Sequence, residues 1–165
     1  MDPTNIIERL VAAPPGSDLE EAMQARAEIL RLSQASHDAV VTPADPGGFS
    51  HAERAALAER MARHNSDPEL AAHYRERLES AGANGTLVEI ASLASNPALD
   101  NRLAAVVQFT DLVTLCPRDA RRSDIDGLKL AGISEPDIVR LTELLAFVNY
   151  QVRVIAGFKL GGKAR

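Results

Sequence analysis

The chain has 165 residues, of which 45% are hydrophobic and 25% charged, a composition that suits one soluble domain with a substantial core. The net charge is -5 and lysine and arginine are scattered among acidic residues, which argues against nucleic acid and against an anionic membrane surface as partners. No apolar run approaches the roughly 20 residues of a membrane span, residues 1–11 do not resemble a secretory signal, and Cys116 is the only cysteine, so we expect a cytoplasmic protein.

The sequence predicts an all-α protein, because aromatic residues make up only 4% and no run of alternating β-branched residues indicates a strand. Thr4 can cap a short helix that ends near Ala13, before two prolines and a glycine. Ser17 and Glu20 form a capping-box pattern that opens a helix over residues 17–36. A turn-rich loop at 42–48 follows, so we expect residues 1–49 to form an N-terminal helical arm.

The second part of the chain, residues 50–162, is predicted to be one helical domain. Ser50 and Glu53 repeat the capping-box pattern. Asp67 followed by Pro68 is a strong helix start, because aspartate accepts from free backbone N–H groups and proline needs no donor in the first turn. Ser123 with Asp126, and Ser134 with Asp137, are expected to cap the last two helices. The predicted helices cover residues 50–64, 67–81, 86–94, 99–115, a segment that begins at 123, and 134–157.

The last predicted helix has two apolar sides. One side carries Ile138, Leu141, Leu145, Val148, Val152 and Ile155, and the other carries Leu144, Phe147 and Val154. Two apolar sides imply two packing partners, because a soluble monomer rarely exposes that much apolar surface. We expect one partner to be the domain core and the other to be a second subunit.

The segment from Glu53 to Tyr74 resembles the alkylhydroperoxidase branch of the carboxymuconolactone decarboxylase-like family, in which a Glu-Arg-Glu helix start leads to Cys-x-x-Cys and then histidine. On that pattern the two cysteine positions fall on Asp67 and Leu70, the proton-relay glutamate on Ala55, and the histidines on His73 and Tyr74. Peroxide reduction by this branch needs one thiolate to attack and a second thiol to resolve the sulfenic acid. The chain therefore resembles a cysteine-less, uncharacterised subgroup of the family.

The resemblance extends over residues 50–162, through the Asp-x-x-x-Leu-x-x-Ala-Gly stretch near Ser123 and the Phe-Val-Asn-Tyr segment at 147–150 with its following arginine. It implies an alkylhydroperoxidase-like helical fold built on a helical hairpin. It also implies assembly as a homo-oligomer (dimer, trimer or hexamer), with pockets near the subunit contacts.

Three residues are candidates for acid–base chemistry. His73 can act as a base near neutral pH and the Tyr74 hydroxyl can donate to a substrate, but Tyr74 also fits a packing position between Leu70 and Leu78. Glu53 can serve as an acid or base if it is buried, although its capping-box position already explains it.

Asn149 and Arg153 are candidates for ligand binding, because residues four apart on one helix face can hold a carboxylate. Alternatively, Arg153 pairs with an acid such as Glu143 of a neighbouring chain, and Asn149 satisfies backbone groups. Both interpretations predict that the two side chains are buried.

A redox role for Cys116 is not expected. Nearby arginines would favour its thiolate, but a helix C-terminus disfavours it and no resolving cysteine exists, so a buried structural cysteine is the better interpretation. The four histidines show no i, i+4 pair, so we expect no metal and no cofactor.

Three functions remain open. The first is a non-redox member of the family that binds a small organic molecule or assists a partner enzyme. The second is an acid–base lyase or isomerase acting on a carboxylate metabolite. The third is a peroxidase-related subunit that obtains its thiols from a cysteine-bearing sibling.

Overall fold

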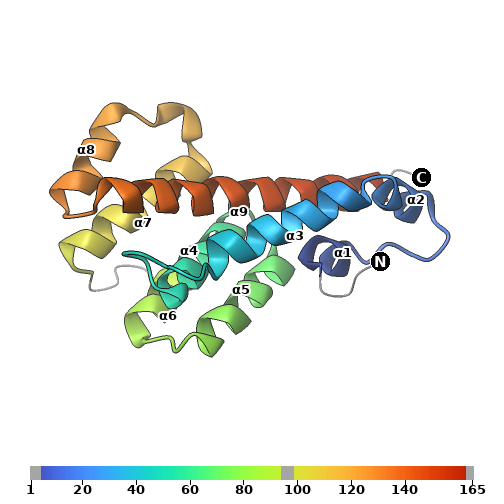
Figure 1. Ribbon diagram of the computed structural model, residues 1–165, viewed down its shortest axis with the longest axis horizontal. Helices are drawn as coiled ribbons and strands as arrows, with labels where there is room; N and C mark the ends of the chain where they lie inside the picture. Colours follow the sequence, from blue (N-terminus) through green and yellow to red (C-terminus); the bar gives the residue numbers. More distant parts are fainter. Residues whose placement is uncertain (1–4, 94–98, 163–165) are drawn as a thin grey trace.

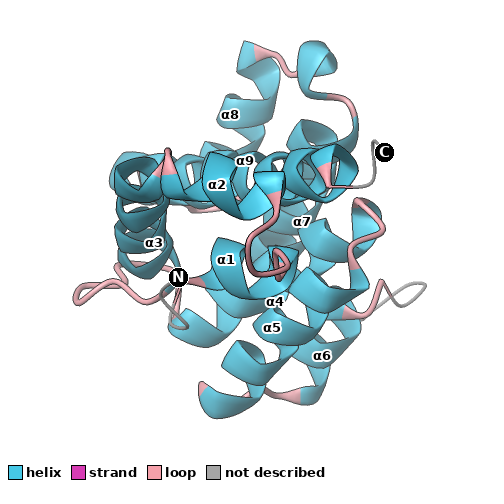
Figure 2. Ribbon diagram, turned by 90° about the vertical axis from the view of Figure 1, so that its right-hand side faces the viewer, coloured by secondary structure: helices cyan, strands magenta, loops and turns pink. Residues whose placement is uncertain are grey.

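A computed structural model describes residues 5–93 and 99–162, and within those ranges the ribbon contains only helices and loops (Figure 2). The all-α prediction is confirmed. The helices are α1 (Ile6–Val11), α2 (Asp18–Gln24), α3 (Ala27–Val41), α4 (His51–His64), α5 (Pro68–Ser80), α6 (Gly85–Ala91), α7 (Asn101–Leu115), the 3-10 turn η1 (Pro117–Asp119), α8 (Arg122–Leu130) and α9 (Glu135–Gly161).

The long helix α9 runs along the whole long axis of the molecule (Figure 1). α3 lies beside one half of it, with α1 and α2 at the same end, and α7 and α8 lie at the opposite end. α4 is the central helix on the other side, where it packs against α5, α6, α7 and α9. None of the helices in the described part is long and apolar enough to cross a membrane.

Small side chains on α4 allow its neighbours to approach closely. The predicted buried side of this helix is confirmed, since its residues are 3% exposed or less: Ala55, Leu57, Ala58, Met61 and Ala62. Leu70, Tyr74 and Leu78 of α5 pack on the same core and are fully buried. Ile7 of α1 and Leu30 of α3 belong to this core as well, so the N-terminal helices share it with the rest of the chain.

The predicted starts of α2, α4, α5 and α9 are confirmed. Ser17, Asp67 and Ser134 each accept a hydrogen bond from a backbone N–H in the first turn of their helix. Ser50 and Glu53 form the complete capping box of α4, because each side chain accepts from the other residue's backbone.

Several other boundaries differ from the prediction. The helix expected over residues 17–36 is two helices, because Arg26 leaves the helical region (φ -115°, ψ 16°), and the second helix continues to Val41. α1 is capped by Asn5, whereas Thr4 lies outside the described residues, and it ends at Val11, because Ala12 adopts a positive φ of 48°.

In the C-terminal part, α8 starts one residue before the predicted cap Ser123, because the Asp124 carboxylate accepts from the backbone N–H of Arg121. α9 continues past the predicted end at Gly157 to Gly161. The expected helix end at Ala94 and the restart at Asn96-Pro97 lie outside the described residues.

The predicted loop at 42–48 is held by a buried arginine. Arg54 is 2% exposed and donates to the backbone carbonyls of Val40, Pro46 and Phe49. The Asp137 carboxylate, on the first turn of α9, accepts from the Gly48 N–H at 2.9 Å. A Cβ at Gly48 would lie 2.5 Å from that carboxylate, so any other residue there would force the Asp137 side chain or the loop to shift.

Candidate functional site

His73 and Tyr74 lie inside the protein, where no substrate reaches them without an opening of the fold. His73 is 4% exposed and Tyr74 is fully buried. The Tyr74 hydroxyl donates to the Gln151 side-chain oxygen at 2.5 Å, which joins α5 to α9. The tyrosine thus packs between Leu70 and Leu78 with its one polar atom satisfied.

The fold brings His73 against His37 of α3, a contact that the sequence did not predict. The two Nε2 atoms are 3.2 Å apart, and both rings lie against Tyr74. Arg9 of α1 places Nη2 2.9 Å from His73 Nδ1, and Asp38 Oδ1 lies 3.0 Å from His37 Nδ1. A polar chain therefore runs through the core from Arg9 to Asp38.

Arg9 and Asp38, at the two ends of this series of polar contacts, fix the direction of its hydrogen bonds. Arginine can only donate, so His73 accepts at Nδ1 and carries its proton on Nε2. That proton points at His37 Nε2, which accepts it, and His37 then donates from Nδ1 to the carboxylate of Asp38. Both imidazoles are neutral in this arrangement, and every ring nitrogen has a partner; His37 Nδ1 also lies 3.4 Å from Gln34 Nε2.

Burial favours the same neutral state. The pKa of His73 is lowered to about 3, mainly by desolvation and further by His37 and Arg9, and burial also lowers the pKa of His37. Burial raises the pKa of Tyr74. Both histidines are thus neutral at pH 7, and the cluster connects α1, α3, α5 and α9 rather than facing a ligand.

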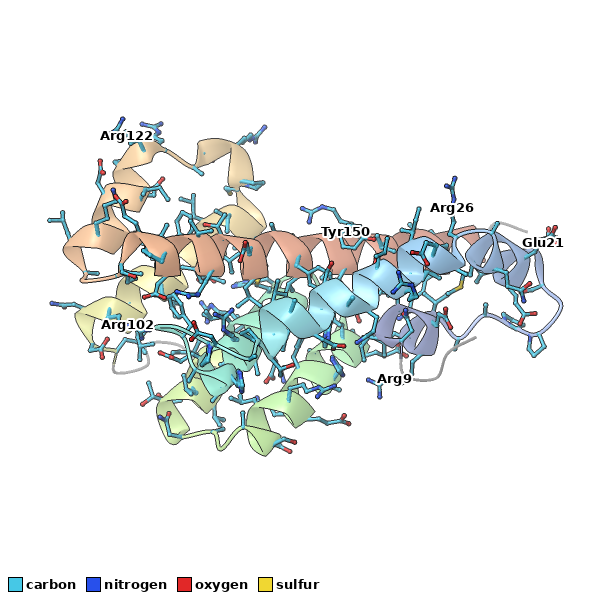
Figure 3. The ribbon with its side chains drawn as sticks, in the orientation of Figure 1. Arg9, Glu21, Arg26, Arg102, Arg122 and Tyr150 are labelled. Atoms are coloured by element: carbon cyan, nitrogen blue, oxygen red, sulfur yellow. The ribbon has the colours of Figure 1, made fainter. Side chains whose placement is uncertain are left out.

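Glu53 is occupied by structural contacts. Its Oε2 accepts from the Ser50 backbone N–H, and its Oε1 accepts from Arg102 Nη1 at 2.5 Å. Arg102, labelled in Figure 3, also bonds the Gly48 carbonyl and lies over the Phe49 ring. The carboxylate therefore fastens α4 and α7 to the loop.

Asn149 and Arg153 lie at the surface, contrary to the predicted burial. Asn149 is half-buried and Arg153 is exposed, because this side of α9 faces outward beside α7. Arg153 Nη1 donates to the backbone and side-chain oxygens of Asn149. The two residues line a shallow groove of about 260 Å³, whose other lining residues include Phe109, Val113 and Leu145.

Cys116 is exposed, so the expectation of a buried structural cysteine is wrong. It follows the last turn of α7, where the chain turns into η1 at the surface. Within the described part of the chain no group of three histidine, cysteine or acidic residues could hold a metal ion.

A larger surface pocket of about 660 Å³, at least as open as the groove at Arg153, lies where α4 ends and α5 begins, close to the end of α6, and we call it the cavity. Its lining residues are Arg63, Ser66, Asp67, Pro68, Ala71, Ala72, Arg75, Ser92 and Leu93. This volume falls within the ordinary range of small-molecule sites. The cavity includes Asp67, one of the positions at which the family resemblance places a cysteine, whereas the other, Leu70, is buried in the core.

Two arginines that line this cavity are held in place by ion pairs with one buried carboxylate. Glu59 is fully buried, and its Oε1 accepts from Arg63 Nε at 2.8 Å and from Arg75 Nη2 at 2.8 Å. Its Oε2 has no hydrogen-bond partner among the described residues. Two guanidinium groups share one carboxylate, and the side chains of Arg63 and Arg75 are 40% and 23% exposed. Both side chains line the cavity, and each guanidinium group has more N–H donors than its bonds to Glu59 use.

The cavity wall contains strained backbone. Only three non-glycine residues in the described ranges have a positive φ, and two of them, Ser66 (φ 56°) and Leu93 (φ 60°), line this cavity. Such a conformation costs about 1–3 kcal/mol per residue and is concentrated at binding and catalytic sites. The Asp67 carboxylate is engaged in capping, since it accepts from the Leu70 N–H at 3.0 Å.

The sequence analysis did not single out Glu59, Arg63, Arg75 or His37. Glu59 and Arg63 are four residues apart on one helix, a spacing typical of an ion pair, and this was the one available signal. The contacts of Glu59 with Arg75 and of His37 with His73 join different helices.

In a comparison with known proteins, no protein-family model and no curated protein matches the chain.

Proposed function

We propose that the protein is a non-redox relative of the carboxymuconolactone decarboxylase-like family that binds a small organic carboxylate in the cavity lined by Arg63 and Arg75. One observation carries the proposal. Two guanidinium groups converge on a single oxygen of the buried Glu59 and line a cavity of about 660 Å³. The chain has one cysteine, so it cannot form the intramolecular disulfide of a dithiol peroxidase.

Fixed cationic donors favour an anion at this point. Arg63, Arg75, Glu59 and the lining residue Asp67 together carry no net charge, but Glu59 is buried and the Asp67 carboxylate caps α5, whereas the ion pairs hold both guanidinium groups in place before a ligand arrives. Guanidinium groups bind carboxylates through paired N–H donors, and a preorganised pair loses little side-chain entropy on binding. Ala71, Ala72 and Leu93 supply an apolar wall for the carbon skeleton of the ligand.

The other two hypotheses receive less support from the geometry. An acid–base lyase built on His73 and Tyr74 would need both side chains to reach a substrate, and both are buried. The Asn149 and Arg153 groove is smaller and offers a single cation. The third hypothesis, a cysteine-bearing sibling, stays a hypothesis, because no contact among the described residues bears on it.

Thermal unfolding in the presence of benzoate, succinate and citrate tests the proposal. A ligand present at a hundred times its Kd stabilises the folded state by about 2.7 kcal/mol, which raises the Tm by roughly 5–10 °C for a chain of this size. Arg75→Met removes one donor and leaves Glu59 paired with Arg63, so the variant should fold and lose the ligand-induced rise.

The matched control is Arg31→Met, which removes an exposed arginine paired with Glu28 outside the cavity. We expect this variant to respond to the ligand as the wild type does. A wild type that none of the three acids stabilises, or an Arg75→Met variant that responds fully, would contradict the proposal.

A further inference from the structure

The outward side of α9 carries a symmetric pattern of residues. Six exposed positions follow one another at alternating spacings of four and three residues, which places them in one stripe along the helix. They are Val139, Glu143, Ala146, Tyr150, Arg153 and Gly157. We call these six residues the α9 stripe.

The stripe is related to itself by reversal about position 148. Reversal exchanges Val139 with Gly157, Glu143 with Arg153, and Ala146 with Tyr150. Each exchanged pair is complementary, because two pairs match a larger side chain with a small one and the third matches opposite charges. A two-fold symmetric interface requires a surface that is complementary to itself in this way.

The two charged residues of the stripe form no salt bridge within the described part of the chain, although the Glu143 carboxylate favours the charged form of the buried Arg54 electrostatically. Glu143 and Arg153 are ten residues apart on one helix, which separates them by about 15 Å along its axis. Neither forms an ion pair with another residue in the ranges 5–93 and 99–162, and Arg153 bonds only oxygens of Asn149. In an antiparallel pair of α9 helices the two residues would meet twice, once on each side of the two-fold axis.

The apolar surface around the stripe extends onto α3. Val139 and Tyr150 are 57% and 40% exposed, and Ile29 and Leu32 of α3 are 48% and 50% exposed. The Ser33 and Tyr150 hydroxyls are 2.8 Å apart, which places this part of α3 directly beside α9. Figure 3 labels Tyr150 over the right-hand half of α9, and Figure 1 shows α3 alongside the same half of that helix.

We infer that the partner for this surface is a second copy of the chain, packed antiparallel along the α9 stripe with Glu143 of each copy paired to Arg153 of the other. The second copy covers Val139 and Tyr150, and its small residues Ala146 and Gly157 allow the helices to approach closely. The lining of the cavity at Arg63 includes no residue of the α9 stripe. The dimer and the proposed ligand site can therefore be tested independently.

Sedimentation equilibrium on the full chain tests this inference through charge exchange. Glu143→Arg places like charges opposite each other at two symmetric points, and so does Arg153→Glu, so each variant should raise the dimer Kd by about a hundredfold or more. Both positions are exposed, and circular dichroism should show an unchanged helix content.

Restoration of the dimer is the decisive part of this experiment. The double variant E143R/R153E restores opposite charges at both points and should dimerise again. A mixture of the two single variants should form a heterodimer, because each of its contacts then pairs opposite charges. A monomeric wild type, single variants that dimerise as the wild type does, or a double variant that stays monomeric would each overturn the inference.

Discussion

Acidification should destabilise the protein through the buried pair His37 and His73. The pKa of His73 is lowered from an ordinary value of 6.5 to about 3, chiefly by burial, so the unfolded chain binds a proton there more readily than the folded chain. The resulting contribution to stability is complete above pH 6.5 and is lost as the pH falls toward the folded-state value. His37 shifts in the same direction.

The size of the effect follows from the pKa values. A histidine that titrates near 6.5 when unfolded and near 3 when folded contributes about 2 kcal/mol less at pH 5 than at pH 8. The substitution His73→Gln removes this titration and keeps an acceptor for Arg9 and a donor for His37. Between pH 8 and pH 5, the free energy of unfolding of the His73→Gln variant should therefore fall by about 2 kcal/mol less than that of the wild type.

Urea denaturation of both proteins at pH 8 and pH 5 measures this difference directly. His51→Gln is a matched control, because His51 is half-buried, bonds the Pro43 carbonyl and lies outside the cluster. We expect the control to lose stability with acid as the wild type does. Equal losses in the wild type and in His73→Gln would refute the description of His73 as a neutral, buried histidine.

Three further predictions concern single side chains. Arg54→Met leaves three backbone carbonyls without their donor and should cost about 3 kcal/mol in urea denaturation; a loss below about 1 kcal/mol would contradict its role in holding the loop. Tyr74→Phe leaves the buried Gln151 oxygen unpaired and should cost about 1–3 kcal/mol, whereas an unchanged midpoint would rule out that hydrogen bond. With a dithiol reductant, wild type and Cys116→Ser should reduce peroxide at the same background rate, and a rate that only the wild type shows would make Cys116 a peroxidatic site.

Patterns formed by residues close together in the sequence predicted much of the fold but few of the residues of the site. Ser50 with Glu53 and Asp67 with Pro68 give helix starts from neighbouring residues alone, and both are confirmed. The break at Arg26 has no capping side chain and so leaves no signal in the sequence.

The site residues depend on which helices meet. Arg75 bonds Glu59 because α5 folds back on α4, a contact that no spacing within one helix reveals. Arg153 is exposed because the described residues leave that side of α9 uncovered, whereas Leu144, which was expected to face a second subunit, is buried in the chain's own core. Amphipathic pattern alone did not distinguish these two environments.

Binding of a carboxylate by Arg63 and Arg75 can be read from the side-chain Nε–H signals of these two arginines. The ¹⁵N-labelled protein would be titrated separately with benzoate, succinate and citrate. We expect saturable shifts of both signals with at least one acid, while the signal of Arg153 stays unchanged. Titrations that leave Arg63 and Arg75 unmoved, or that shift Arg153 alone, would contradict it.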